Sequence, residues 1–455
     1  MIIAGLDIGT TSISALVIES DTGEVLESVT EPNRMKVKGK HTFEQLQKPE
    51  EIVSLSIAIL DEIIEKYNPK SVGLTGQMHG ILYTDKDGLA VSPLITWQDG
   101  RGEQPYPDSG VSYTQELVNR IDVLPESVHY SQLASGYGSV THFYNTKNNL
   151  IPKNATEFCT IQCYVAMRLC GRKTALLHAS DAASLGLYDL ENACFAQDAI
   201  KAADLSTQFF PETTTDNAIM GSYKNVPISI GLGDNQASFL GAVRDTKNSV
   251  LVNIGTGSQI SIISGSCFAK SPIEARPFIN KEFIQVGASI CGGESYAILE
   301  KFFSQVLKIV SCDNTEKLYD KMNEAALAHI DAAEKLEVST FFRGTRQDGS
   351  IRGGISGISA DNFTPQMLAV GFLEGMVNAL WDMYLIMEPE RKRNVLVGSG
   401  NAVRNNPALR EILKRRFGLE LLIPIHKEEA AFGAALFGYV AAFGTTPSDK
   451  CIKYL

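Results

Sequence analysis

The chain contains one strand–turn–strand pattern twice, once at its N-terminus and once near its middle. Residues 6–14 read LDIGTTSIS and residues 252–261 read VNIGTGSQIS. Each copy places a turn of Gly, Thr and Ser between two apolar runs, which is typical of two strands joined by a tight turn. An internal repeat indicates duplicated architecture. Because 455 residues suffice for two or three domains, we expect two similar halves, residues 1–240 and 241–455.

Apolar runs of strand length alternate with segments of helical spacing, so the fold class is α/β. Strands are expected at Ile2–Ile8, Ser12–Ile18 and Val25–Val29, and a helix from Pro49 towards Lys66. Two later helices carry clear boundary signals. Thr364 precedes Pro365 at one start, and Asn406 precedes Pro407 at the other, which Gly418 ends.

The two repeated turns could hold phosphate, because glycine leaves backbone N–H groups open and threonine adds hydroxyls. The first turn contains Thr10 and Thr11, and the second contains Gly255 and Thr256. Asp7 adds a carboxylate that could hold hydrated Mg²⁺. Either turn alone reads as an ordinary hairpin, but their near-identity favours a polyphosphate gripped from both sides. The sequence has no Gly-x-x-x-x-Gly-Lys-Ser/Thr segment.

A possible general base stands in the loop GLGDNQ at residues 231–236, between a short strand and an apolar helix start. Asp234 could accept a proton from a hydroxyl nucleophile, which contributes roughly 10²–10⁴ in rate. The alternative is a carboxylate that only caps the helix.

Two polar strings in the first half suit a ligand with many hydroxyl groups. Residues 76–80 read GQMHG and supply Gln77, Met78 and His79, and residues 96–101 read TWQDGR and supply Trp97, Asp99 and Arg101. Taken singly, His79 could be an ordinary loop histidine and Trp97 a core residue. In the second half, residues 398–405 read GSGNAVRN, where glycines would let a flat base approach the backbone or would simply form a turn.

In this order the motifs resemble those of the FGGY carbohydrate kinases over nearly the whole chain. The resemblance rests most on residues 76–80 and 96–101, with Ser135-Gly136-Tyr137-Gly138 in support. It implies two actin-like ATPase domains of the RNase H-like type, with a central cleft between them that binds MgATP and a ketose. It also implies phosphorylation of a terminal hydroxyl, with sedoheptulose the expected substrate and a pentulose (xylulose or ribulose) the alternative.

Carried over by motif, the resemblance makes Asp234 the catalytic base and Asp7 the Mg²⁺-associated carboxylate. Gln77, Met78, His79, Trp97, Asp99 and Arg101 fall on the sugar side. The nucleotide side then comprises these residues: Thr10, Thr11, Gly255, Thr256, Gly292, Gly293, Gly400, Asn401 and Asn405.

Two positions depart from the family pattern. Ser14 stands where many relatives have Lys or Arg that can reach phosphate, and residues 143–147 follow the usual Lys-containing signature only loosely. Ser14 favours a rival interpretation, a non-catalytic actin-like nucleotide-binding protein. The sugar-side strings and both aspartates speak against that rival, since a scaffold would not need them.

Net charge and hydropathy indicate which kinds of partner the chain can bind. The formal net charge is −11 and no block of Lys and Arg occurs, so no nucleic acid is expected. The longest nearly apolar stretch, residues 430–444, is shorter than the roughly 20 residues of a membrane span and reads as a buried helix. Without a basic leader before an apolar run, we expect a cytoplasmic protein. A homodimer is left open.

Overall fold

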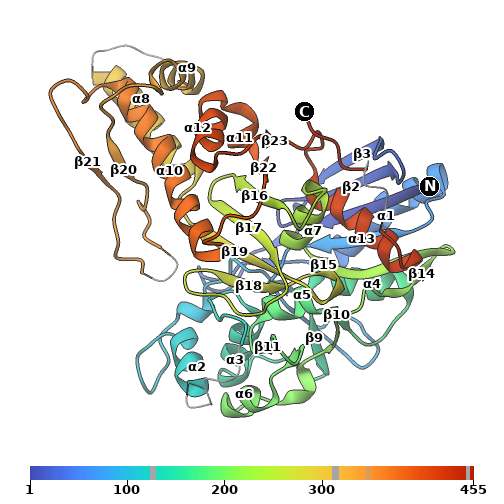
Figure 1. Ribbon diagram of the computed structural model, residues 1–455. Coiled ribbons are helices and arrows are strands. Elements are labelled where there is room, and N and C mark those ends of the chain that lie inside the picture. The colour runs from blue at the N-terminus through green and yellow to red at the C-terminus, as the bar shows by residue number, and fades with distance from the viewer. Residues whose placement is uncertain (123–129, 310–316, 346–347, 447–450) are drawn as a thin grey trace.

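The structure is a computed structural model that describes residues 1–122, 130–309, 317–345, 348–446 and 451–455 (Figure 1). Two six-stranded mixed sheets dominate it, one from each half of the chain. The first sheet has the order β14-β15-β6-β1-β2-β3 and the second the order β18-β19-β17-β16-β22-β23. The fold is therefore α/β, as the sequence predicts.

The strands of the first sheet are β1 (Ile2–Ile8), β2 (Ser12–Glu19), β3 (Val25–Pro32), β6 (Val72–Gly76), β14 (Ile219–Tyr223) and β15 (Val226–Gly233). The strands of the second are β16 (Ser249–Ile254), β17 (Ser258–Ser264), β18 (Glu274–Pro277), β19 (Phe283–Ser289), β22 (Val395–Ser399) and β23 (Leu421–Leu422).

Each sheet is built around the repeated motif. In the first, β1 pairs antiparallel with β2 and parallel with β6, so that Asp7 lies opposite Thr75 on β6. In the second, β16 pairs antiparallel with β17 and parallel with β22, so that Asn253 lies opposite Ser399 on β22. The strand–turn–strand pattern is therefore duplicated in three dimensions.

The long helices are α1 (Pro49–Tyr67), α4 (Ile161–Cys170), α7 (Asp234–Ala242), α8 (Gly293–Ile309), α9 (Tyr319–His329), α10 (Pro365–Met387), α12 (Pro407–Phe417) and α13 (Glu429–Phe443). They pack on these sheets or, in the case of α8 and α9, on α10. In α1, eight buried residues recur at helical spacing and face the first sheet. The Thr364 hydroxyl accepts from Met367 N–H to start α10, and Gly418 ends α12 in the left-handed region, as expected.

Helix α13 comes from the end of the chain yet lies on the first sheet, against α7 (Figure 1). Small residues allow this close contact. A Cβ at Gly433 would lie 1.8 Å from the Ala237 carbonyl oxygen, and one at Gly73 would lie 1.6 Å from the Ala434 carbonyl oxygen. The division of the chain at residue 240 stays a prediction, because this helix returns to the sheet of the first half.

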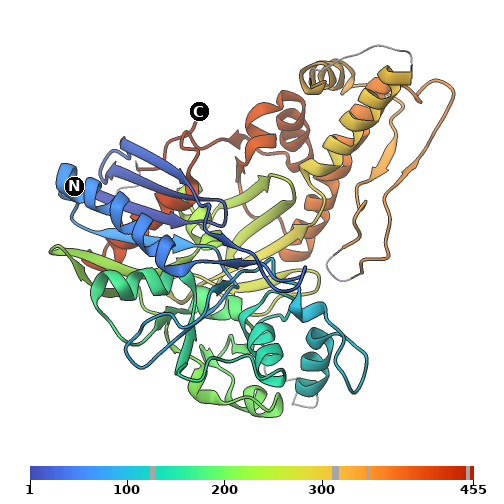
Figure 2. The same cartoon turned by 180° about the vertical axis from the view of Figure 1, so that it is seen from behind.

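The remaining elements form a lobe beside the sheets and an arm beyond α10, and both views show the lobe below the first and second sheets (Figures 1 and 2). The lobe includes α2 (Tyr113–Ile121), α3 (Gly138–Lys147), α5 (Ala179–Ala182), α6 (Gln197–Ala202), β4 (Lys36–Val37), β5 (Leu46–Gln47), β7 (Leu82–Thr84), β8 (Leu94–Ile95), β9 (Glu157–Cys159), β10 (Leu176–His178), β11 (Tyr188–Asp189), β12 (Cys194–Phe195) and β13 (Glu212–Thr214). The arm holds β20 (Glu337–Ser339) and β21 (Gly354–Ser356), and a short helix, α11 (Asn401–Asn405), follows β22. Within the described part of the chain, no helix combines the length and apolarity that a membrane crossing requires.

Candidate active site

Three neighbouring cavities lie at the candidate site, and shared residues connect them. The first has a volume of about 160 Å³ and shares Met78, His79 and Arg276 with the second. The second, of about 600 Å³, shares Gly255 with the third, of about 490 Å³. One continuous path therefore leads from the lobe to α8 and α12.

The first cavity is lined by hydroxyl, imidazole and phenol groups together with apolar side chains such as Leu190 and Ile273. The His79 ring stacks on Tyr137 at 4.1 Å between centroids, and its Nδ1 lies 2.7 Å from the Ser184 carbonyl oxygen. His79 has a φ of 74°, a strained value for this residue type, which indicates that its surroundings fix its position. Ser180 and Ser184 also line this cavity and add hydroxyls. These groups suit a polyhydroxylated ligand.

The second cavity brings together Asp7 from β1 and Asp234 from α7, both half-buried. Burial raises the pKa of Asp234 to about 6, while the Asn235 N–H and the charge of Arg276 act in the opposite direction. Burial also raises the pKa of Asp7 to about 7, and the charges of Asp234 and Glu428 add to the rise. A carboxylate with a pKa near neutrality is well matched to accepting a proton from an alcohol.

Buried polar groups form hydrogen bonds to the backbone of Leu232 and Gly233, immediately before Asp234. The Gly233 N–H donates to the Ser180 hydroxyl over 3.1 Å, and that hydroxyl lies 2.8 Å from His178 Nδ1. Thr75 Oγ1 donates to the Leu232 carbonyl oxygen over 2.8 Å. The backbone before Asp234 is therefore fixed before any ligand binds.

The second repeated turn lies against the start of α8. The N–H groups of Gly292 and Glu294 donate to the Thr256 carbonyl oxygen, and that of Gly293 donates to Gly255, all over 2.9–3.0 Å. A Cβ at Gly292 would lie 2.4 Å from the Gly257 backbone, and one at Gly293 would lie 2.5 Å from the Gly255 oxygen. The glycine pair is thus required for the turn to approach the helix.

The third cavity combines flat apolar and amide groups. Tyr296, Leu373 and Met376 supply apolar surface, and Asn401 and Asn405 supply amides. Thr256 and Gly293 also line it, so this cavity continues directly from the second turn. Gly400, which precedes Asn401, has a φ of 87°, and a Cβ there would lie 2.4 Å from the Ile254 oxygen. The shape suits a nucleoside.

The first repeated turn lies beside these cavities without lining them. Trp97 Nε1 donates to the Thr10 hydroxyl over 3.0 Å, and that hydroxyl donates to Gln77 Oε1 over 3.2 Å. Thr11 is exposed. The structure therefore brings Thr10, Gln77 and Trp97 together but does not bring them, or Thr11, to the walls of the three cavities.

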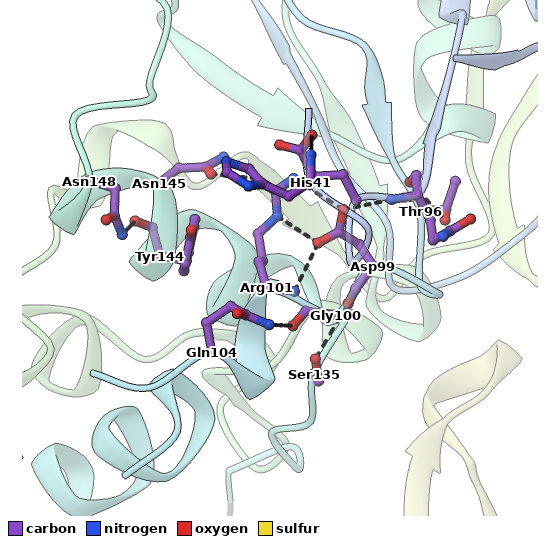
Figure 3. A network of polar contacts seen from close by, with 12 residues as sticks. His41, Thr96, Asp99, Gly100, Arg101, Gln104, Ser135, Tyr144, Asn145 and Asn148 are labelled. Carbon is purple, nitrogen blue, oxygen red and sulfur yellow. Dashed lines mark hydrogen bonds and ion pairs between the residues drawn. The ribbon is translucent and has the colours of Figure 1, made fainter. Parts of the chain in front are cut away.

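Asp99 and Arg101 form a buried ion pair (Figure 3), and neither residue lines the three cavities. Arg101 Nε donates to Asp99 Oδ1 over 2.7 Å, and Arg101 Nη1 donates to Asn145 on α3. Asp99 also accepts from the Gln45 N–H. Asp99 and Arg101, which the sequence places on the sugar side, do not line the first cavity. Instead, the pair connects the loop of residues 96–101 to α3 through the bond from Arg101 to Asn145.

The structure shows where the two departures from the family pattern, Ser14 and residues 143–147, lie. Ser14 is buried on β2 directly opposite Asp7, and its hydroxyl lies 3.1 Å from Thr30 Oγ1. Residues 143–147 lie in α3, where Phe143 is buried and Lys147 forms an ion pair with Asp204. The serine leaves Asp7 without a cationic neighbour at that position.

Sequence reasoning missed Arg276 and gave Tyr137 only a supporting role. Arg276 lies on β18 and lines the first and second cavities. Its strand carries no motif, so only the alternation of Glu274 and Arg276 on one face could have drawn attention to it. Tyr137 stands in a Gly-rich string whose stacking on His79 depends on long-range folding.

The chain resembles known kinases over its whole length. The model of the N-terminal domain of the FGGY family of carbohydrate kinases matches residues 2–241, more than half of the chain. Sedoheptulokinase from Mus musculus is 25% identical over 477 residues, covering 95% of this chain and 96% of that protein. A xylulose kinase from Staphylococcus epidermidis is 23% identical, covering 97% and 88%.

Solved structures agree on the fold. The crystal structure of xylulose kinase from Rhodospirillum rubrum superposes with a TM-score of 0.85 at 17% identity, covering 100% of this chain and 93% of that chain. The predicted fold class, two actin-like ATPase domains of the RNase H-like type with a central cleft, is confirmed. The predicted resemblance is confirmed as well: the chain belongs to the FGGY family of carbohydrate kinases.

Proposed function

We propose that this carbohydrate kinase transfers the γ-phosphoryl group of MgATP to a terminal hydroxyl of a ketose, most specifically sedoheptulose, giving sedoheptulose 7-phosphate. The observation that carries the proposal is the continuous path of three cavities with Asp234 in the middle one. The sugar would occupy the first cavity, the phosphates the second and the adenosine the third.

Asp234 would act as the general base. The sugar hydroxyl gives its proton to the Asp234 carboxylate while its oxygen bonds to the γ-phosphorus. The bond from that phosphorus to the bridging oxygen breaks, and ADP leaves with the electron pair. Such transfer needs positioning and charge stabilisation more than covalent help from the protein. The fixed loop before Asp234 supplies the positioning.

The donors present fit a magnesium ion held mainly by the nucleotide. Asp7 offers carboxylate oxygens as ligands in the central cavity, and burial together with the charges of Asp234 and Glu428 raises its pKa and disfavours its ionised form. In the described part of the chain, no group of three or more His, Cys, Asp or Glu side chains is placed to hold a metal. Asp7 would therefore hold Mg²⁺ together with phosphate oxygens and water, and the ion would neutralise phosphate charge.

Sedoheptulose is preferred because sedoheptulokinase from Mus musculus matches the chain from end to end. A pentulose is the alternative, because a xylulose kinase matches it over a similar span. A non-catalytic nucleotide-binding protein is disfavoured by the first cavity, since such a protein would have no use for His79, Tyr137 and Ser184 around an acceptor space.

The test is an ADP-release assay with MgATP and equal concentrations of sedoheptulose, xylulose and ribulose, followed by product identification. We expect the highest kcat/KM with sedoheptulose and a product phosphorylated at its terminal hydroxyl. A preference for a pentulose would replace the substrate, and calorimetric binding of ATP with no binding of any sugar would support the non-catalytic alternative.

A further inference from the structure

Arg276 occupies the junction between the first and second cavities. It lies on β18, the edge strand of the second sheet, whereas Asp234 begins α7 and His79 lies in the loop after β6, both in the first half. The Arg276 side chain is 15% exposed, so it is largely withdrawn from bulk solvent yet lines both cavities. In the proposed reaction, this junction is where the acceptor oxygen meets the γ-phosphoryl group.

Hydrogen bonds between the two halves fix β18 relative to α7, the helix that begins with Asp234. Gln236 on α7 donates through Nε2 to the Pro277 carbonyl oxygen over 3.0 Å, one residue beyond Arg276. Asn235 Nδ2 donates to Gln259 Oε1 on β17, also over 3.0 Å. Arg276 is therefore held at a defined place with respect to Asp234.

The guanidinium is anchored on one edge and open on the other. Nε and Nη2 both donate to Glu274 Oε2, over 3.1 and 2.7 Å. Within the part of the chain that the structure describes, Nη1 has no hydrogen-bond acceptor, although Arg276 lines both cavities. An arginine held by a carboxylate on one side can offer its other N–H donors to an anion without first reorganising.

Positive charge is scarce along the path. Among the described residues that line the three cavities, Arg276 is the single arginine or lysine, whereas Asp7 and Asp234 both line the central one. A triphosphate tail brings further negative charge, and the transferring group spreads charge over its three equatorial oxygens.

We propose that Arg276 is a catalytic residue whose Nη1 edge donates to the oxygens of the phosphoryl group during transfer. The inference rests on the proposed kinase function and adds to it a residue from the second sheet. Asp234 accepts the proton from the hydroxyl, and Arg276 stabilises the charge that develops on the phosphoryl oxygens. Because the two residues come from different halves and line one cavity, the site needs both halves of the chain.

The experiment compares Arg276→Met and Arg276→Lys with the matched control Lys270→Met, an exposed lysine in the connection before β18. Losing a donor aimed at the transition state costs roughly 10²–10³ in kcat. We expect that loss for Arg276→Met with the KM for ATP changed less than threefold, a smaller loss for Arg276→Lys, and wild-type kinetics for Lys270→Met. In Arg276→Met alone, Glu274 loses its ion-pair partner, which could destabilise the fold. The double variant Glu274→Gln/Arg276→Met removes that charge as well, and it should show the same loss of kcat with a wild-type melting temperature.

A second readout does not depend on the sugar. MgADP with fluoroaluminate mimics the phosphoryl group in transfer, and Arg276→Met should weaken calorimetric binding of this complex at least tenfold while leaving MgADP binding unchanged. Wild-type kcat and fluoroaluminate affinity in a folded Arg276→Met protein would overturn the role of Arg276 and leave the kinase intact. If the wild type phosphorylates no ketose but the fluoroaluminate effect is present, the acceptor is wrong and Arg276 keeps its role.

Discussion

Replacing Asp234 with Asn should greatly lower kcat and at the same time stabilise the protein above neutral pH. Burial raises the pKa of Asp234 from 3.8 to about 6, so the folded protein binds this proton more tightly than the unfolded chain does. Ionisation of Asp234 therefore opposes folding. Asparagine has nearly the same shape and carries no charge, so it removes this cost.

The size of this stabilisation and the pH range over which it appears both follow from the raised pKa of Asp234. About two pKa units correspond to about 3 kcal/mol. Because the carboxylate lines an open cavity, solvent screening reduces this to about 1.5 kcal/mol. The cost is absent below pH 3.8, where both states are protonated, grows as the pH rises, and is complete above the folded value of about 6. The charges that share this region are Asp7, Asp181 and Arg276.

Urea unfolding of the wild type and Asp234→Asn near pH 5 and near pH 8 measures the effect. The gain in the free energy of unfolding should be larger at the higher pH, while kcat falls by roughly 10²–10⁴ as expected for a lost general base. In the wild type, kcat/KM should fall about tenfold per pH unit below about pH 6. A variant that is less stable than the wild type near pH 8, or that keeps kcat within tenfold, would refute the reasoning.

Three further substitutions test the packing around the site. Gly293→Ala should raise the KM for ATP about tenfold, because its Cβ would lie 2.5 Å from the Gly255 oxygen and displace the second turn. Gly265→Ala, which has open space around it, is the matched control. An unchanged KM in Gly293→Ala would count against the second turn as a phosphate site. Gly433→Ala should lower the free energy of unfolding by about 1–3 kcal/mol in urea, because its Cβ would lie 1.8 Å from the Ala237 oxygen, and wild-type stability would show that α13 can shift freely. Arg101→Met should destabilise by about 3–5 kcal/mol because it leaves Asp99 buried and unpaired, whereas a raised sugar KM at wild-type stability would instead give Arg101 a direct role at the substrate.

Local signals in the sequence predicted the local structure well. The strand at Ile2–Ile8, the Thr364 cap and the Gly418 helix end depend on neighbours within a few residues, and the structure has all three. The predicted buried helix at residues 430–444 is also present as α13. Its place on the first sheet was not predictable, because it depends on glycines far apart in the sequence that let backbones touch.

The candidate site was predictable in part for the same reason. Met78, His79, Asp7 and Asp234 stand at strand ends, and the sheet order brings those ends to the cleft. Asp99 and Arg101 have the composition of a ligand site, yet their charges are satisfied by each other and by Asn145. Composition alone cannot tell a charged pair that binds a ligand from one that fastens a loop.

The duplicated motif also explains why the cleft has an asymmetric charge. Asp7 and Asn253 occupy equivalent positions, since each lies on the first strand of its hairpin opposite a hydroxyl residue of the parallel neighbour, and both line the central cavity. A second aspartate at residue 253 would place three carboxylates around a cavity whose described lining offers one guanidinium. Like charges at this range disfavour ionisation and repel phosphate. In the proposed reaction, neutral Asn253 would leave the second half free to accept the phosphate tail, while Asp7 and Asp234 of the first half would supply the carboxylates for transfer.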